Sequence, residues 1–575
     1  MAKAASRPRR RFRVPRVPRG TLGKDVPAGV VLGVESVPDG LAGGLLAGVN
    51  PVYGLYGYVF GTLFGAVATS SAFMAVQATG AMAVVVSDIE QVRGDTPEAA
   101  TALFTLSVLA GVVMLGLGLA RMGWIVRWVP NAVLTGFINA VAVNIVLGQL
   151  DSFSGYAAEG ANRVVRAVDT ALHMADFVWP TVVVGTVTIV LIVVLERTRL
   201  GALGMVIAIV LGSALVVVAD MDQVAQLRDI TEVPGGLPAP QLPSLGLVGS
   251  LIIPALSLAF VGLVQGAAIS SSVPNPDGEY PDASGDFRGQ GVANIGAGIF
   301  QGMPVGGSMS ATSIVTTAGA RSRLALFVAA GTMIAVLLLL ADLVGYIAMP
   351  ALAGLLMVVG VKTFKPDNVR MVVRTGPVQA TVMLTTFVLT MVIPLQYAVL
   401  IGVGLSVILY VARQSNRIQV KQWVFADDGT VREKQPPAEL PAGETVVLRP
   451  YGSLFFAAAA AFEAALPAVT DRSRHSVVII TLRGKEDLGS TFINVVTRYA
   501  ERLHAVDSTL MLAGVADRVT DQLASTGAIT AIGHDNVFRA TPAVTESTRR
   551  AMAAAQPPAT RRGDAPASDP DDQST

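Results

Sequence analysis

The chain has 575 residues, of which 52% are hydrophobic and only 14% are charged, and its mean hydropathy is +0.58. This composition excludes an ordinary soluble globular protein and indicates a polytopic membrane protein. The formal net charge is +1 and cysteine is absent, so disulfides, thiolate metal sites and cysteine nucleophiles are excluded. The four histidines are scattered along the chain, which leaves little for a zinc site.

Arginines crowd the extreme N-terminus, where residues 1–25 form a basic segment. By the positive-inside rule we expect this end to be cytoplasmic. Prolines interrupt the arginines, and the first long apolar run begins only near Val26. We therefore expect no cleaved signal peptide. The arginines are Arg7, Arg9, Arg10, Arg11, Arg13, Arg16 and Arg19.

Apolar windows between residues 26 and 413 predict a transmembrane domain of fourteen segments. Three windows, 73–88, 289–302 and 305–320, are shorter than the roughly 20 residues that a full crossing needs, and they are rich in Gly, Pro, Ser and Thr. Irregular backbone at membrane depth survives only where it is buried in protein or lines a polar cavity. The predicted segments are 26–47, 51–69, 73–88, 101–120, 130–150, 177–197, 203–220, 250–272, 289–302, 305–320, 324–345, 348–363, 377–394 and 396–413.

The composition changes after Val411. We interpret residues 414–443, which carry charges and a proline-rich stretch, as a linker. Alternating strand and helix patterns over 444–548 predict a small cytoplasmic α/β domain, and 549–575 are expected to be a disordered tail. The predicted strands are 445–450, 476–482, 509–513 and 536–539, and the predicted helices are 457–466, 490–504 and 517–526.

Two interrupted segments hold corresponding places, each third among the seven segments of its half. Residues 73–82 form the first and 302–312 the second. Such a pair points to an inverted-repeat transporter with a site near the middle of the membrane. Each segment would present the amide-rich, positive start of a half-helix, which can hold an anion without a cationic side chain. The alternative is that these small residues merely permit close helix packing.

Polar side chains at membrane depth are the next candidates. Glu35 and Asp39 lie four residues apart on one helical face, and a central carboxylate usually faces a cavity or a partner. At least one should be functional, unless both lie in a solvated vestibule. The amide of Gln265 can contact a substrate or tie two helices together. Three asparagines of the fifth segment are expected to form interhelical hydrogen bonds; they are Asn131, Asn139 and Asn144.

Four stretches along the chain carry a resemblance to a known family. The first is VPDGLA (37–42) with LAGVNPVYGLY (46–56), and the second is LTGF (134–137) with GQL (148–150). The third is GQGVANI (289–295), which leads into MPVGGS (303–308). The fourth is YGSLFFA (451–457) with LGSTF (488–492). In this order the four stretches resemble the SulP family of anion permeases over nearly the whole chain, and the fourth is similar to the STAS module that such permeases carry.

The resemblance implies a polytopic α-helical membrane protein with two inverted repeats of seven segments and a C-terminal STAS domain. It further implies a substrate site between the facing ends of segments 3 and 10, elevator-like movement of a core against a gate, and a homodimer. Substrates across the family include sulfate, bicarbonate, chloride and dicarboxylates, often coupled to protons or sodium. By position, the matching site residues are Gln77, Ala78, Thr79 and Gly80 in the third segment and Gly307, Ser308, Met309 and Ser310 in the tenth.

The sequence departs from the family pattern at two places. Many members carry a carboxylate in the eighth segment where this chain has Gln265, and that acid is usually linked to coupling. We hypothesise that Glu35 or Asp39 supplies the titratable group, or that transport is exchange without a co-ion. In the STAS-like domain we interpret Ser490 first as a helix N-cap and second as a phosphosite, and we expect this domain to contact cytoplasmic protein partners or to dimerise.

The leading hypothesis is a secondary transporter of small inorganic or carboxylate anions in the cytoplasmic membrane, with both termini cytoplasmic. A nucleobase permease would resemble the membrane part but normally lacks a STAS domain. A membrane receptor or scaffold that no longer transports is the other alternative. The sequence shows no catalytic triad, Walker-type phosphate loop or metal cluster, so we predict neither enzymatic activity nor a cofactor, and we expect no nucleic-acid partner.

Overall fold

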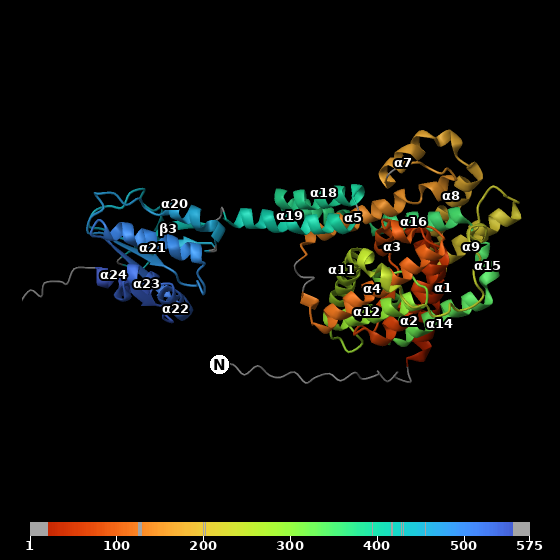
Figure 1. Cartoon of the computed structure of the whole chain (residues 1–575), viewed down its shortest axis with the longest axis horizontal. Coiled ribbons are helices and arrows are strands. Elements are labelled where there is room, and N and C mark those ends of the chain that lie inside the picture. The colour runs from red at the N-terminus through yellow and green to blue at the C-terminus, as the bar shows by residue number, and fades with distance from the viewer. Residues whose placement is uncertain are drawn as a thin grey trace, which may run out of the picture. The chain divides into compact units, whose positions relative to one another are not determined.

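The computed structural model describes residues 21–555, except 125–128, 161, 199, 202, 394, 416–417, 427, 429, 453 and 455. The chain divides into two compact units between Ser406 and Val407, and Figure 1 colours both along the chain. Residues 1–20 of the predicted basic segment and residues 556–575 of the predicted tail lie outside the described residues. Residues 22–25, assigned to the basic segment, are already the first turn of helix α1.

All fourteen predicted segments occur in the described part of the chain, and the boundary between the two units falls within the last of them. Seven of the described helices are long and apolar enough to cross a membrane. The first seven segments are α1 (Leu22–Ala47), α2 (Pro51–Ala68), β1 (Ala75–Gln77) with α3 (Gly80–Ser87), α4 (Pro97–Leu119), α5 (Asn131–Leu147), α8 (Trp179–Glu196) and α9 (Leu203–Val218). The second seven are α11 (Val248–Ser272), α12 (Ala283–Ile299), β2 (Gly306–Ser308) with α13 (Met309–Thr317), α14 (Leu324–Leu339), α16 (Met349–Thr363), α18 (Pro377–Val392) and α19 (Leu395–Ser415).

Short helices join these segments. They are α6 (Leu150–Ser154), α7 (Arg163–Leu172), α10 (Leu227–Ile230), α15 (Ala341–Gly345) and α17 (Pro366–Thr375). Helix α7 follows α5 and α6 in the chain and packs against both, and it also contacts α18.

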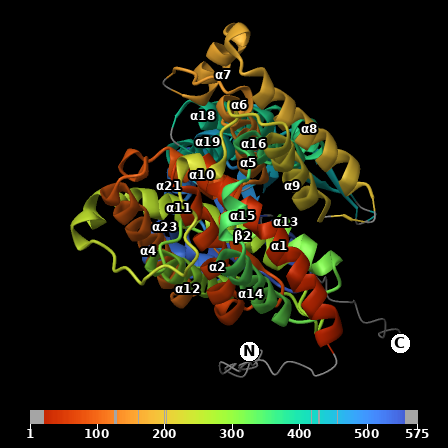
Figure 2. The same ribbon diagram turned by 90° about the vertical axis from the view of Figure 1, so that its right-hand side faces the viewer.

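The membrane unit contains two helix bundles, which separate in both Figure 1 and Figure 2. We define the core bundle as α1, α2, α3, α4, α11, α12, α13 and α14, and the flanking bundle as α5, α6, α7, α8, α9, α16 and α18. The most extensive helix contacts, such as α4 with α12 and α1 with α14, lie within the core bundle. Close approach there depends on glycine, since a Cβ atom on Gly54 of α2 would lie 2.1 Å from the carbonyl oxygen of Gly40 in α1.

Asparagines of α5 hold the flanking bundle together. The Asn144 side chain donates to the carbonyl of Thr390 in α18 (3.1 Å), and Asn139 accepts from the backbone N–H of Lys365 after α16 (2.7 Å). The interhelical role predicted for these two residues is therefore confirmed. Each bond also satisfies a polar group that would otherwise be buried alone.

The C-terminal domain is a six-stranded sheet in the order β4-β3-β5-β6-β7-β8, with strands β5 to β8 parallel. The strands are β3 (Gln419–Phe425), β4 (Val431–Lys434), β5 (Thr445–Tyr451), β6 (Val477–Thr481), β7 (Thr509–Val515) and β8 (Val537–Arg539). Helices α20 (Ala459–Ala465), α21 (Ser490–His504), α22 (Asp517–Ser525) and α23 (Ala528–Ile532) cover one face, and α24 (Glu546–Ala555) covers the other.

Three expectations for this domain are wrong. Strands β3 and β4 lie inside the predicted linker 414–443 and pair with the sheet; most of their side chains are polar and at least partly exposed, so their composition resembled that of a linker. Residues 549–555 belong to helix α24, whose Ala551 is buried against the sheet, and not to a tail. The N-cap of α21 is Gly489, and Ser490 is the first helical residue.

Candidate functional site

The two interrupted segments pair with each other in the middle of the core bundle. Strands β1 and β2 run antiparallel, with Ala75 opposite Ser308 and Gln77 opposite Gly306. Helix α3 therefore leaves one end of this ribbon and α13 leaves the other. The two helix N-termini face each other across three residue pairs, which span roughly 7 Å at about 3.4 Å per residue.

A hydroxyl side chain caps each of these two helices. Thr79 Oγ1 accepts from the backbone N–H of Met82 (3.3 Å), and Ser308 Oγ accepts from that of Ala311 (3.3 Å). Capping satisfies one amide in each first turn, and the other early N–H groups have no partner within their own helix. The start of each helix also carries the positive end of its dipole. Both ends are therefore suited to a negatively charged group.

The structure brings the sequence-predicted residues of both segments to this ribbon, but they are oriented differently. Gln77 is 1% exposed, and its Nε2 donates to Ser36 (2.9 Å) and Thr62 (3.2 Å). Its side chain therefore fixes β1 to α1 and α2. Ala78 is buried, whereas Thr79 and Gly80 are partly exposed. On the other side Gly307 and Ser308 are buried, and Met309 (42%) and Ser310 are exposed.

Gln265 of α11 lies beside this pair of helix ends. Thr79 Oγ1 donates to Gln265 Oε1 (3.0 Å), and a Cβ atom on Gly306 would lie 3.3 Å from the same oxygen. The amide oxygen is therefore occupied. The Nε2 group makes no hydrogen bond to another described residue, and the side chain is partly exposed. Gln265 thus joins the two interrupted segments and retains donors of its own.

Two side chains of α12, absent from the candidates predicted by sequence, hold strand β2. Asn294 accepts from the Val305 N–H (2.9 Å) and donates to the Val305 carbonyl (2.6 Å), so it pairs with the backbone as a neighbouring strand would. Gln290 Oε1 accepts from the Gly307 N–H (3.1 Å). The two residues are four apart on one helical face, which is the pattern that could have identified them.

The two acidic candidates of α1 have different surroundings. Asp39 accepts a hydrogen bond from the Tyr58 hydroxyl of α2 (2.6 Å). Glu35 is 9% exposed, and its Oε2 has no hydrogen-bond partner among the described residues. Glu35 is therefore the carboxylate with an unused acceptor.

A groove of about 670 Å³ is lined by the C-terminal parts of α8 and α16 in the flanking bundle. An ion pair between Lys362 and Glu196 lies in it, and Arg197 lines the same groove. The remaining lining residues are Ile189, Val193, Met357, Val358 and Val361. Charged groups thus gather at this end of the flanking bundle.

The sequence matches the Sulfate permease family over residues 22–386 and the STAS domain over residues 437–542. A probable sulfate transporter of Mycobacterium tuberculosis is 24% identical over 539 residues, which are 92% of this chain and 96% of that protein. The bicarbonate transporter BicA of a Picosynechococcus strain is 27% identical over 417 residues, with 71% of this chain and 74% of that protein covered.

Solved structures share the fold. The murine solute carrier 26 family member A9 anion transporter in the inward-facing state superimposes with a TM-score of 0.81 at 18% identity, covering 93% of this chain and 92% of that one. The transmembrane domain of a cyanobacterial BicA gives a TM-score of 0.58 at 23% identity, covering 68% of this chain and 98% of that one. With its membrane part and its C-terminal domain both matched, the chain belongs to the sulfate permease family, with a STAS domain at its C-terminal end.

Proposed function

We propose that the chain is a secondary transporter that carries small anions across the cytoplasmic membrane. The observation that carries this proposal is the antiparallel β1–β2 ribbon, from which the N-termini of α3 and α13 face each other. An anion between them would be held by backbone N–H groups and two helix dipoles. The Nε2 group of Gln265 and the hydroxyl proton that the Ser308–Ser310 hydrogen bond leaves free would complete its shell of donors. Thr79 would hold the Gln265 amide in place.

Alternating access would follow from movement of the core bundle against the flanking bundle. Both interrupted segments belong to the core bundle, so the bound anion would travel with it as one body. Contacts between the bundles are fewer than those within them, which favours relative movement at that boundary. The relatives' names include sulfate and bicarbonate, and backbone donors accept either ion, so we propose this substrate class, with related carboxylate anions included.

The co-ion, if one is used, would act through α1. Glu35 is the stronger candidate, because it keeps an unpartnered oxygen while Asp39 is held by Tyr58. Protonation of Glu35 would satisfy that oxygen and remove a buried charge. Transport without a co-ion is the alternative, and sodium is the other co-ion to test.

We place both termini and the STAS domain in the cytoplasm, on the basis of the arginine-rich N-terminus and the even number of segments. A homodimer, with the STAS domain contacting protein partners, is the assembly we propose. Ser490 stays in this proposal only as a possible site of phosphorylation, at the exposed end of α21.

Uptake by proteoliposomes tests the function. We expect saturable accumulation of labelled sulfate or bicarbonate in vesicles that contain the purified chain, with competition by related anions and no uptake in empty vesicles. A folded chain that shows no saturable flux for any anion of a panel of sulfate, bicarbonate, chloride and dicarboxylates would contradict the proposal and favour a receptor or scaffold.

A further inference from the structure

One arginine of the flanking bundle reaches the core bundle at the far end of half-helix α3. Arg163, the first residue of α7, donates through Nη2 to the hydroxyl of Ser87, the last residue of α3. Helix α7 packs on α5, α6 and α18, and α3 carries half of the candidate anion site. This hydrogen bond therefore links the moving half of the site to the bundle that it would move against.

The end of α3 is well suited to a guanidinium group. The Ser87 hydroxyl donates to the Val84 carbonyl (2.7 Å), which leaves its lone pairs for Arg163. Arg93 donates through Nε to the Ser87 carbonyl (2.6 Å). Because the C-terminus of a helix carries the negative end of its dipole, two cations there are favourable.

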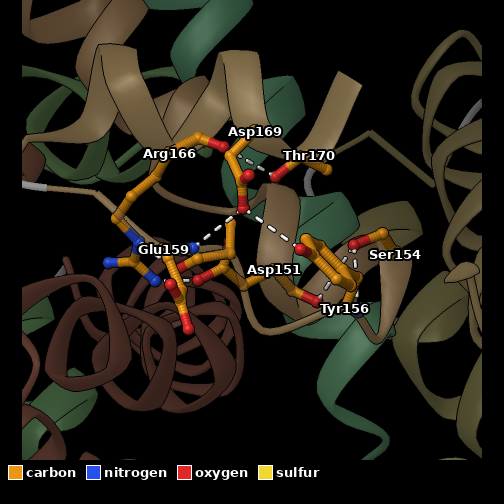
Figure 3. A network of polar contacts seen from close by, with 8 residues as sticks. Asp151, Ser154, Tyr156, Glu159, Arg166, Asp169 and Thr170 are labelled. Atoms are coloured by element: carbon orange, nitrogen blue, oxygen red, sulfur yellow. Dashed lines mark hydrogen bonds and ion pairs between the residues drawn. The ribbon is translucent and has the colours of Figure 1, made fainter. Parts of the chain in front are cut away.

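A polar network fixes the direction in which α7 presents Arg163 (Figure 3). Asp169 accepts hydrogen bonds from the Tyr156 hydroxyl (3.2 Å) and from the backbone N–H of Glu159 (2.9 Å). The bond from Glu159 stabilises the charged carboxylate and so lowers the pKa of Asp169. One turn after Arg163, Arg166 forms an ion pair with Asp151 of α6. Helix α7 is thereby tied to α6 and to the loop that joins them.

The C-terminal part of α5 lies beside both Arg163 and the start of α3. A Cβ atom on Gly148, directly after α5, would lie 3.4 Å from Nε of Arg163. Nearby, the start of α3 packs closely on the same helix, since a Cβ atom on Gly80 would lie 2.6 Å from Cδ1 of Ile145. The α3 side of the site is therefore covered by the flanking bundle.

The α13 side is open by contrast. Residues 81–87 of α3 are buried, whereas Met309, Ser310 and Ser313 along α13 are exposed. The structure thus represents a state in which residues 81–87 of α3 are buried and part of the α13 surface is exposed.

We propose that Arg163 and Ser87 form a latch that holds the core bundle in this state, so that their contact must break before the site can face the opposite side of the membrane. This inference rests on the proposed anion transport by movement of the core bundle. Arg163 is in this sense a positioning residue, which acts on the orientation of the site without contacting the anion.

Reversible cross-linking tests the latch. Because the sequence contains no cysteine, the introduced cysteines are the only thiols that the reagent can modify. We would introduce Ser87→Cys together with Arg163→Cys and bridge the two thiols with a bifunctional methanethiosulfonate reagent about as long as an arginine side chain. The matched control is Asp151→Cys with Arg166→Cys, which links the same helix α7 to α6 within the flanking bundle.

We expect the bridged Ser87–Arg163 pair to lose at least about 90% of anion flux and to regain it when dithiothreitol cleaves the bridge. The bridged control pair should keep its flux. Full flux in the bridged chain, or no bridging at Ser87 and Arg163 while the control pair is bridged, would overturn the latch. Absence of saturable flux in the wild type would instead refute the proposed function, which keeps the two failures apart.

A second measurement needs no bridge. Ser313→Cys on exposed α13 reports accessibility through its rate of reaction with a membrane-impermeant thiol reagent. Adding Arg163→Gln should shift the equilibrium between the two orientations roughly tenfold away from this state if a charge-assisted hydrogen bond of typical strength is lost. The labelling rate should fall in proportion to the remaining population of this state. Arg163→Lys should preserve part of the rate. An unchanged rate in the glutamine variant would show that the contact does not control the orientation of the site.

Discussion

Thr79 and Gln265 are joined by a hydrogen bond of 3.0 Å between residues 186 positions apart, one in each half of the membrane unit. Thr79 serves at the same time as the N-cap of α3, with its hydroxyl oxygen facing the Met82 N–H. The position of the Gln265 side chain therefore depends on the same hydroxyl group that caps the start of half-helix α3. Because Gln265 carries an uncharged amide, the residues that we assign to the proposed site supply hydrogen-bond donors and include no carboxylate.

Gln265→Glu is expected to make transport dependent on pH. A carboxylate beside the proposed anion would repel it, so the substitution should lower flux at neutral pH by about tenfold or more. Protonation removes this charge, and flux should therefore rise as pH falls. The measurement is initial uptake into proteoliposomes between about pH 5.5 and 8, with the wild type as reference. Equal pH profiles for the two proteins would mean that Gln265 does not contact the anion.

Thr79→Val removes both hydrogen bonds of the Thr79 hydroxyl while nearly preserving the volume of the side chain. Loss of a helix cap costs about 1 kcal/mol, and loss of a further hydrogen bond costs a similar amount. We expect the KM for anion uptake to rise by about tenfold or more. Thr79→Ser keeps the hydroxyl and should remain close to the wild type. If the serine and valine variants are equally impaired, the methyl group and not the hydroxyl is important.

Gly307→Ala should separate strand β2 from α11. The added Cβ atom would lie 2.9 Å from the Gly266 Cα and 3.0 Å from Cδ1 of Ile269, closer than side chains normally pack, so the ribbon must shift. We expect flux to be lost while the chain still reaches the membrane. Gly331→Ala in α14 is the matched control, because nothing lies within 4 Å of its added Cβ. Equal flux in both variants would argue against a precisely placed ribbon.

Glu35→Gln and Asp39→Asn separate the two coupling candidates. If uptake is driven by protons, Glu35→Gln should abolish the stimulation by an imposed pH gradient, because the amide cannot exchange a proton. Asp39→Asn should retain that stimulation, since Asp39 is already held by Tyr58 at 2.6 Å. Counterflow of labelled anion at equal pH serves as the control for folding and binding. Gradient-driven uptake that survives in the double variant removes both residues from the coupling mechanism.

Sequence patterns predicted the membrane part well because lipid imposes one simple rule, that long apolar runs form helices. They also located both interrupted segments. The register that places Ala75 opposite Ser308 was not predictable, because it depends on Asn294 and Gln290 from a third segment. The direction of the Gln77 side chain was unpredictable for the same reason, since Ser36 and Thr62 of two other helices fix it.

The C-terminal domain was predicted best where strands are buried on both faces. Strands β5, β6 and β7 are apolar runs at the centre of the sheet, and their sequences are unambiguous. The antiparallel strands β3 and β4 contain polar residues such as Lys421, Gln422 and Arg432, and most of their side chains are at least partly exposed, so they lack the apolar run of a central strand. A short amphipathic helix such as α24 acquires its structure from packing against the sheet, which composition alone does not reveal.

Ser490 gives the last prediction, because its structural role differs from the one expected from sequence. Gly489 is the N-cap of α21, and the Ser490 side chain forms no capping hydrogen bond in the described part of the domain. Ser490→Ala should therefore change the free energy of unfolding of the C-terminal domain by less than about 0.5 kcal/mol. The measurement is thermal unfolding of the full chain, followed through a probe in that domain.

Ser473→Ala is the matched comparison. Ser473 is fully buried; its hydroxyl donates to the Leu440 carbonyl (2.9 Å) and accepts from the Thr470 N–H (3.1 Å). Removing it leaves two buried backbone groups without a partner, which should cost about 1–3 kcal/mol. If Ser490→Ala is as destabilising as Ser473→Ala, the Ser490 hydroxyl does cap the helix in solution. A small effect of Ser490→Ala would mean that the serine is not needed for the stability of the exposed end of α21. Phosphorylation of Ser490 would then be the next role to test.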